Sequence, residues 1–241
     1  ISYVTGLVKG DLGTSLRTKR PVLTEVQGRY MNTVQLTLLS LTWSVIAGVL
    51  IGVWSGRNRS KWQDYTGMTV AVSGISMPSF WIGFMLIMVF AVKYRLLPTT
   101  GAGSFKNLIL PSITLGVSIA AIIARFTRSS VIEVLKEDYV RTARAKGLRE
   151  KTVIWKHVFR NCMISVVTVV GLQFGFLLGG SVVTETVFAF PGLGSLLIES
   201  VNYRDYPAIQ SLILIFSLHF VLINLVVDVL YAVLNPEIQL S

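Results

Sequence analysis

Few residues of this sequence have the type and spacing that acid–base, nucleophilic or metal chemistry requires. The only histidines are His157 and His219, and neither has a carboxylate partner at close helical spacing. Such chemistry needs a base within hydrogen-bond reach of a nucleophile, or several ligands gathered around a metal. The single cysteine, Cys162, lies at the edge of an apolar run, where packing is a commoner role than redox chemistry. We therefore expect no catalytic residue and no metal site, and we assign His219 a hydrogen-bonded packing role.

Polar residues within the long apolar runs are the remaining candidates for a functional site. Asn224 and Asp228 lie one helical turn apart on the same face of the last apolar run, at about residues 207–234. An ionisable residue in a membrane helix is a functional candidate by default, but Asp228 also lies close enough to the end of the run to pair with a loop arginine. Pro78 lies inside the second apolar run, at about residues 67–92, and predicts a bend in that helix. Such a bend serves either as a pathway hinge or for packing. The candidate pathway residues are Pro78, Gln173, Glu185, Asn224 and Asp228.

The fourth apolar run, at about residues 162–184, and the segment that follows it contain two of these candidates, Gln173 and Glu185. Gly171, Gly175 and Gly179 recur every four residues, which puts them on one helix face where another backbone can approach closely. Tight helix packing explains this spacing most simply, and a pathway wall that includes Gln173 is compatible with it. Residues 184–194 are too apolar for an ordinary exterior loop and too interrupted by Pro-Gly for a span. We expect residues 185–205 to form an exterior re-entrant segment or cap.

The longest charged stretch of the sequence runs from Glu133 to Arg160. Apolar or small residues recur in three- and four-residue steps from Val131 to Ala143, which predicts one face of an amphipathic helix. Gly147 suits the left-handed turn that ends such a helix. A second amphipathic stretch follows, so residues 131–160 are predicted to form a helix, a glycine turn and a second helix outside the membrane. The apolar side of the second stretch comprises Ile154, Trp155, Val158 and Phe159.

Two kinds of partner suit this helical unit. A basic interfacial hairpin would bind anionic lipid, which accounts for the positive charge. Acidic residues weaken that attraction, whereas mixed charge around a small apolar ridge suits a groove in another protein. The acidic residues favour the protein partner, and they are Glu133, Glu137, Asp138 and Glu150.

The composition is that of an integral membrane protein. The sequence is 52% hydrophobic and only 14% charged, with a mean hydropathy of +0.65. A net charge of +10 would be compatible with nucleic-acid binding if the basic residues gathered on one solvent-exposed face. They fall instead between the apolar runs, as they do in membrane loops, and we expect no nucleic-acid partner.

The charge-free stretches are long enough to cross a bilayer, which takes about 20 apolar residues per helix. We predict an all-α polytopic helix bundle over residues 33–241, preceded by an exterior N-terminal segment, residues 1–32. The third span is short, but Arg125 can snorkel to the headgroups and let its helix continue. The alternative is that one of the five is re-entrant. The spans are predicted at about residues 33–56, 67–92, 108–127, 162–184 and 207–234.

The distribution of basic residues predicts the orientation. Thirteen Lys and Arg residues fall on the side of the central loop and the C-terminus, and nine fall on the other side. The positive-inside rule then places the loop and the C-terminus in the cytoplasm. Because the exterior N-terminal segment is basic, we expect an upstream membrane helix to lead it across, which gives six spans in the whole protein.

The central loop resembles a known family. The stretch Tyr139-Val140-Arg141-Thr142-Ala143-Arg144-Ala145-Lys146-Gly147, followed by His157 and Arg160-Asn161, is similar to the cytoplasmic loop of permease subunits in ATP-binding-cassette (ABC) importers. The similarity is to the oligopeptide, dipeptide and nickel branch, which also handles glutathione. The general family pattern, Glu-Ala-Ala before the glycine, is matched only at one alanine and the glycine. Further similar stretches are Gly10-Asp11-Leu12-Gly13, Gly74-Ile75-Ser76, Phe190-Pro191-Gly192-Leu193-Gly194 and Asn224-Leu225 with Asp228.

The resemblance implies a binding-protein-dependent importer of the bacterial or archaeal cell membrane. Two homologous permease subunits would form the pathway, two cytoplasmic ATPases would bind ATP and magnesium, and an extracytoplasmic protein would deliver the solute. This chain has no phosphate-binding Gly-x4-Gly-Lys-Ser/Thr motif, so it is expected to be a transport subunit without cofactor or enzymatic activity. The implied ATPase-coupling residues are Glu137, Asp138, Tyr139, Arg141, Thr142, Ala143, Arg144, Ala145, Lys146 and Gly147.

Two questions stay open at this point. The alternative function is a secondary transporter or channel subunit without ATPase coupling, because a bent span and one carboxylate occur in those proteins too. The implied solutes are dipeptides, oligopeptides, glutathione, and nickel or a metal chelate, and no charged cluster in the spans chooses among them.

Overall fold

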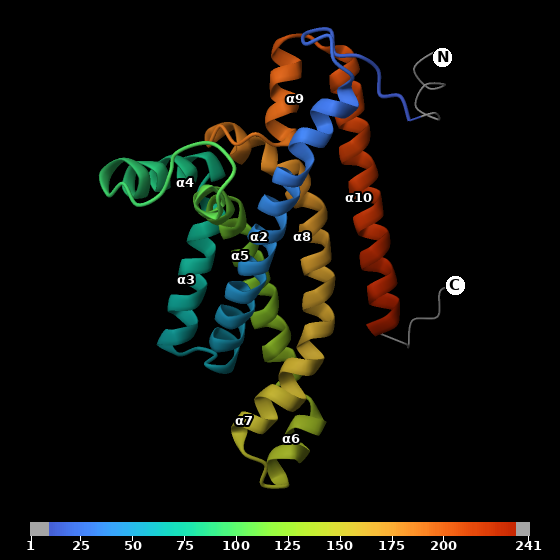
Figure 1. Ribbon diagram of the computed structural model, residues 1–241. Coiled ribbons are helices and arrows are strands. Elements are labelled where there is room, and N and C mark those ends of the chain that lie inside the picture. Colours follow the sequence, from blue (N-terminus) through green and yellow to red (C-terminus); the bar gives the residue numbers. More distant parts are fainter. Residues whose placement is uncertain (1–9, 235–241) are drawn as a thin grey trace. The chain divides into compact units, whose positions relative to one another are not determined.

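The computed structural model describes residues 10–234, except for the side chains of residues 164, 165, 178–180, 228 and 230–234. Within this part of the chain every element is a helix, apart from an isolated bridge between Thr14 and Pro21 (Figure 1). The predicted all-α class is therefore confirmed. The helices are α2 (Val22–Arg57), α3 (Trp62–Ser76), α4 (Ser79–Leu86), the π-helix η1 (Ile87–Lys93), α5 (Phe105–Val134), α6 (Asp138–Ala145), α7 (Glu150–Thr152), the π-helix η2 (Val153–Phe159), α8 (Arg160–Val187), α9 (Leu193–Asn202) and α10 (Tyr206–Leu234).

Three of the described helices are long and apolar enough to cross a membrane by themselves, within Val22–Arg57, Phe105–Val134 and Tyr206–Val227. The number rises to five if each of two bent helix pairs counts as one broken span. The upper count equals the predicted five. Helix α5 continues well past Arg125, as a snorkelling side chain allows.

Two prolines affect the helices differently. Pro111 lies inside α5, which already begins at Phe105 and continues past it. Pro78 does more than bend the second span: α3 ends at Ser76 and α4 starts at Ser79, with Met77 (φ −92°, ψ 131°) and Pro78 (φ −60°, ψ 136°) in extended backbone. A residue before proline is disfavoured in the helical region, which explains a full break at this point.

The chain divides into two compact units, which we describe separately. Of the described residues, the first comprises 10–40, 78–115 and 175–222. Its buried core joins the start of α2 to α9 and α10 through Val22, Val26, Leu193, Leu196, Ala208 and Leu212. The hydroxyl of Tyr30 lies 2.5 Å from Nε2 of His219, and Nδ1 of His219 lies 2.7 Å from the oxygen of Ile215, both within hydrogen-bond distance. His219 thus has the packing role expected for it.

The second unit comprises the described residues 41–77, 116–174 and 223–234. Its α2 segment packs against α5 along three glycines spaced four residues apart. A Cβ atom at Gly48 would lie 2.7 Å from the oxygen of Ala120, and one at Gly52 would lie 2.6 Å from the oxygen of Ala124. At Gly56 it would lie 2.8 Å from Val131. Only glycine lets the helices approach this closely. The predicted tight packing at Gly171 is also present, because Val227 of α10 fills the space there.

Candidate functional site

The segment between α5 and α8 forms the predicted helix–glycine–helix unit (Figure 1). Helix α6 starts after Glu137, whose backbone is extended, and it carries Asp138 in its first turn and Arg144 in its last, as the helix dipole favours. Gly147 has a φ of +75°, and its N–H donates to the oxygen of Arg144 at 2.9 Å. The left-handed turn predicted at Gly147 is therefore present.

One face of this unit packs on the chain itself. Val140 and Ala143 of α6 are 0% and 5% exposed and belong to a buried cluster with Val131, Val153, Ile154, Val158 and Cys162. The predicted continuous amphipathic face from Val131 to Ala143 is wrong, because α5 ends at Val134 and a turn precedes α6. The N–H groups of Lys136 and Glu137 close that turn onto α5. The turn changes which residues face inward, so Tyr139 and Thr142 are exposed.

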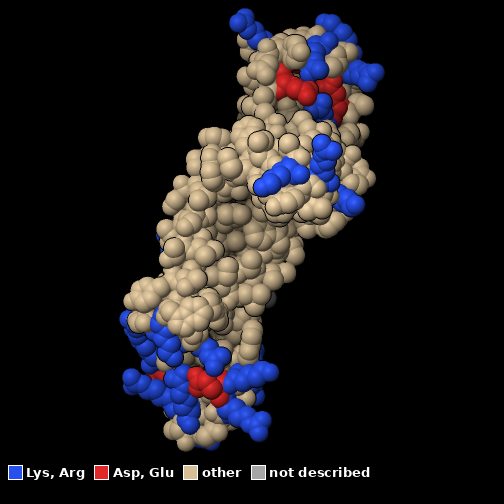
Figure 2. Space-filling model, turned by 90° about the vertical axis from the view of Figure 1, so that its left-hand side faces the viewer, with Lys and Arg blue, Asp and Glu red and all other residues tan. Residues whose placement is uncertain are grey.

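The opposite face of α6 and the glycine turn are open to solvent. Of the residues implied for ATPase coupling, Ala143 is buried and the others are exposed: Glu137, Asp138, Tyr139, Arg141, Thr142, Arg144, Ala145, Lys146 and Gly147. We call these nine residues the α6 outer face. Exposed apolar groups accompany them, with Leu148 at 41% and Trp155 at 48% exposure. Figure 2 shows Lys and Arg side chains gathered over this end of the second unit with acidic side chains among them.

The charges of the α6 outer face are only loosely held. Arg144 donates two hydrogen bonds to Glu150, at 3.2 and 2.9 Å, which raises the pKa of Arg144 and lowers that of Glu150. Both side chains are still more than 40% exposed. Arg141 lies 3.5 Å from Asp138, and their side chains are 74% and 95% exposed. Exposed pairs of this kind contribute about 0–1 kcal/mol to stability. Most of the polar groups here are therefore available to another molecule.

A side-chain contact ties α6 to the start of α8. Asn161 donates one hydrogen bond to the hydroxyl of Tyr139 at 2.8 Å and lies 2.8 Å from the oxygen of His157. The matching sequence stretches contain both Tyr139 and Asn161, but nothing in their spacing indicates this contact.

The candidate pathway residues are distributed over both units. Pro78 marks the break between α3 and α4 in sequence, and Gln173 and Asn224 are half-buried on α8 and α10. The side chain of Asp228 lies outside the described residues. Their role in a pathway stays a prediction.

Glu185, the fifth candidate, is fully buried in the first unit. Its Oε1 accepts a hydrogen bond from the hydroxyl of Thr33 at 2.8 Å, and its Oε2 accepts one from the N–H of Ser195 at 2.9 Å. The same Thr33 oxygen accepts the N–H of Leu193 at 2.8 Å. A side chain on Gly192 would overlap the carboxylate. Glu185 therefore anchors the first turn of α9, which lies in the segment predicted as a cap.

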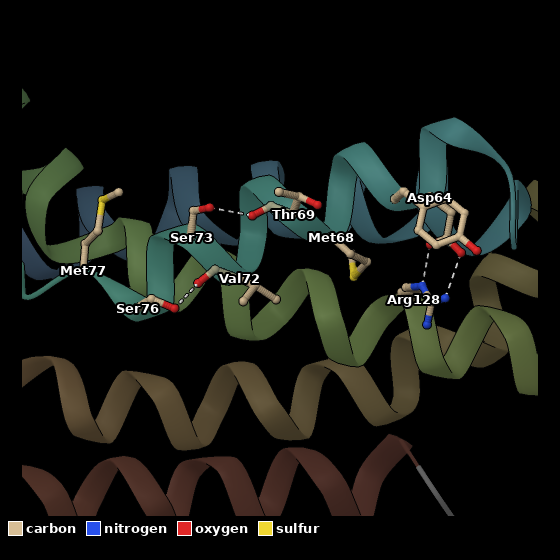
Figure 3. A pocket seen from close by; sticks show the side chains of 9 residues that line it. Asp64, Met68, Thr69, Val72, Ser73, Ser76, Met77 and Arg128 are labelled. Atoms are coloured by element: carbon tan, nitrogen blue, oxygen red, sulfur yellow. Dashed lines mark hydrogen bonds and ion pairs between the residues drawn. The ribbon is translucent and has the colours of Figure 1, made fainter.

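Sequence analysis missed an ion pair in the second unit. Asp64, at the start of α3, is 3% exposed and accepts two hydrogen bonds from Arg128 of α5, at 2.6 and 2.8 Å. Figure 3 shows the pair at one end of a hollow of about 480 Å³ that runs along α3 past Met68, Val72 and Met77. The two residues are far apart in sequence, and nothing near either one indicates the other.

A second missed network holds the segment before α2 to α9 and α10. Glu199 accepts hydrogen bonds from Arg17 at 3.0 Å and from Arg29 at 3.1 Å. Asp205, only 2% exposed, accepts the hydroxyl of Ser15 and the N–H of Leu16, the latter at 3.1 Å. In this second cluster Glu199 is paired with two arginines, and Asp205 is satisfied by hydrogen bonds from uncharged groups.

A helical membrane bundle that carries an exposed helix–glycine–helix loop is the architecture of importer membrane subunits, and comparisons with known proteins support that class. The sequence pattern of the family "Binding-protein-dependent transport system inner membrane component" matches residues 48–240. The chain belongs to this family, and it is a permease subunit of a binding-protein-dependent ABC importer. Its role is transport rather than catalysis, as expected.

Relatives and solved structures agree with this assignment. The glutathione transport system permease protein GsiC of Escherichia coli K12 is 56% identical over 98% of this chain and 78% of its own length. GsiC of Salmonella typhi is 55% identical over the same shares. The fold is similar to an inward-facing structure of the MetNI methionine ABC transporter, with a TM-score of 0.76, 17% identity and coverage of 88% of this chain and 97% of the other. An amino acid ABC transporter gives a TM-score of 0.69 at 15% identity, covering 96% and 98%.

Proposed function

We propose that this permease imports glutathione or a closely related small peptide. The observation that carries the proposal is the 55–56% identity to permeases named for glutathione transport, over nearly the whole chain. Dipeptides, longer peptides and nickel chelates are the competing solutes.

We further infer that the α6 outer face is the docking surface for an ATPase. Its support is the combination of a rigid, self-packed base and an exposed mixed-charge face, a surface suited to a protein groove. In this proposal the loop and the C-terminus are cytoplasmic. A second homologous permease, two ATPases that bind ATP and magnesium, and an extracytoplasmic binding protein complete the importer. Closure of the ATPases on ATP would move the permeases between inward- and outward-open states.

Uptake into vesicles tests the solute. The complete importer is reconstituted with ATP inside, and labelled glutathione, a dipeptide and nickel are each supplied with the cognate binding protein. We expect saturable, ATP-dependent uptake of glutathione that exceeds uptake of the other two. Strong dipeptide or nickel uptake without glutathione uptake would show that the solute assignment is wrong.

The same vesicles separate ATPase-coupled transport from a secondary transporter or channel. Accumulation against a gradient should require ATP hydrolysis and should persist when proton and sodium gradients are collapsed. Accumulation that follows an ion gradient without ATP would contradict the docking proposal as well.

A further inference from the structure

The start of α8 carries a pocket to which the function proposed above assigns no ligand. The pocket has a volume of about 810 Å³. Its polar part comprises Lys156, His157, Arg160 and Asn161, from the last turns of η2 and the first turn of α8. Pockets that hold small organic molecules have volumes of about 300–1,000 Å³, so the pocket is large enough for a lipid headgroup.

The rest of the pocket is apolar and follows the helix. Phe159, Met163 and Val167 line it and are spaced four residues apart, so they form a single stripe along α8. All three side chains are half-buried. The stripe enters the part of α8 that carries no charged residue until Glu185. The pocket therefore changes from cationic to apolar where the helix passes from the charged loop into its apolar run.

The cations of the pocket form no ion pair with the residues that the structure describes. Lys156 and Arg160 are exposed, and neither forms an ion pair with an acidic residue in the described part of the chain. Elsewhere in the same loop, Arg144 does find a carboxylate, on Glu150. Two unpaired cations beside an apolar stripe thus have donors left over for an external anion.

We propose that this pocket binds an anionic membrane phospholipid, with the headgroup phosphate between Lys156 and Arg160 and an acyl chain along Phe159, Met163 and Val167. Arginine and lysine are the side chains best suited to phosphate oxygens. Basic pockets beside membrane helices are a recurring mode of anionic headgroup recognition. A soluble phosphate would use the cations but leave the apolar stripe exposed, so the stripe favours a lipid.

The site also has a structural route to α6. Asn161 lines the pocket and donates a hydrogen bond to Tyr139 on the α6 outer face. A bound headgroup that orders the start of α8 therefore also restricts α6. The binding proposal rests on neither the solute nor the orientation proposed above.

Native mass spectrometry of the complete importer tests the proposal. The importer is reconstituted in nanodiscs of phosphatidylcholine and phosphatidylglycerol. The importer is then released from the nanodisc, and the lipid molecules that stay bound to it are counted. We expect retained phosphatidylglycerol on the wild type. Lys156→Gln with Arg160→Gln should weaken its association about thirtyfold, since each cation near an anionic headgroup contributes about fivefold. Arg149→Gln with Lys151→Gln removes the same charge from exposed residues outside the pocket and should leave retention unchanged.

Each remaining outcome decides the question. If the double variant fails to assemble, Lys156→Gln alone should still lower retention about fivefold in an assembled importer. Equal loss in the pocket and control variants would reduce the effect to general charge and overturn the proposal. Displacement of phosphatidylglycerol by excess inorganic phosphate would identify a soluble anion as the ligand and overturn it too. Retained lipid with loss of a partner subunit in the pocket variant would show that a protein occupies the pocket.

Discussion

The loop around α6 and the segment around α9 both lie between long helices, yet they use their charged residues in opposite ways. Around α9, Glu199 binds two arginines and Asp205 binds the chain before α2. Around α6, apolar residues hold the unit together, and most charged side chains point outward with weak partners or none. We call the segment around α9, residues 185–205, the α9 cap, and we compare it with the α6 outer face.

The difference separates charges that stabilise the chain from charges that remain available to a partner. A buried carboxylate with several donors is part of the fold, and removing it leaves those donors unsatisfied. Substitution of an exposed charge changes the stability of the isolated chain little, so its effect is measurable only in the assembled importer. Substitutions in the two regions should therefore fail in different assays.

The largest expected effect is in the α9 cap. Glu185→Ala leaves the hydroxyl of Thr33 and the N–H of Ser195 without their buried acceptor. We expect it to lower the free energy of unfolding by about 2–4 kcal/mol, because unsatisfied buried donors cost about 1–3 kcal/mol each and not all of the cost is realised. Denaturation of the purified permease in mixed micelles measures this.

Glu137→Ala on α6 is the matched control for Glu185→Ala, since it also removes one carboxylate but from an exposed position. It should change the free energy of unfolding by no more than about 0.5 kcal/mol. Equal losses in the two variants would show that burial is not what distinguishes the regions.

The next largest effect is expected on the coupling of transport to the ATPase. The substitution concerned should not change the free energy of unfolding. Arg141→Glu reverses an exposed charge on the α6 outer face. We expect ATP-dependent uptake to fall about tenfold or more, because a like-charge contact in a protein interface costs several kcal/mol. Uptake, ATPase co-purification and unfolding are measured on the same preparation.

Lys151→Glu is the control for Arg141→Glu, since it reverses an exposed charge that does not belong to the α6 outer face. Its uptake should stay near the wild-type value. Normal co-purification and normal uptake in Arg141→Glu would remove the support for ATPase docking at this face.

Local pattern predicted the helix–glycine–helix layout of the α6 loop, but it did not predict which face of α6 is buried or which residues hold the α9 segment. Gly147 was placed correctly because a glycine after an amphipathic run has few other conformational roles. The burial of Val140 was not predicted, because a short turn after Val134 shifts the helical face and no residue there requires such a turn. Periodicity determines which residues share a face only while one helix continues.

Long-range pairs account for most of what the sequence did not reveal. Arg29 and Glu199 are separated by most of the chain, as are Ser15 and Asp205, and nothing near either residue indicates the other. The hydrophobic composition was enough to predict the all-α bundle, because three of the described helices are apolar enough to cross a membrane by themselves. Asp64 and Arg128 belong with the unpredicted pairs.

A smaller effect is expected from pH in the α9 cap. Burial raises the pKa of Glu199, but hydrogen bonds from Arg29 and Arg17 outweigh it, so the pKa of this carboxyl lies below its ordinary value of 4.5. The stabilisation is therefore complete above that ordinary value and is lost as the pH falls through the lowered pKa. Because Glu199 is 38% exposed, we expect at most about 1 kcal/mol.

Hydrogen exchange of the α9 amides in wild type and Glu199→Gln measures this contribution. The wild type should be better protected near neutral pH, and the difference should shrink below a pH of about 4. A difference that persists unchanged in acid would mean that Glu199 acts through packing rather than through its charge.

The smallest expected effect belongs to the best-formed ion pair of the α6 loop. Glu150→Gln removes the charge that Arg144 contacts at 2.9 Å, but the two side chains are 45% and 42% exposed, so water replaces much of the interaction. We expect a change of about 0.5 kcal/mol or less in the free energy of unfolding, measured beside Glu199→Gln at neutral pH. The Arg29 side chain that binds Glu199 is only 27% exposed, which makes the α9 variant the more costly of the two. The reverse order would mean that the α6 loop, like the α9 cap, uses its charges to hold itself together, and its charged residues would then no longer distinguish a docking surface from a structural one.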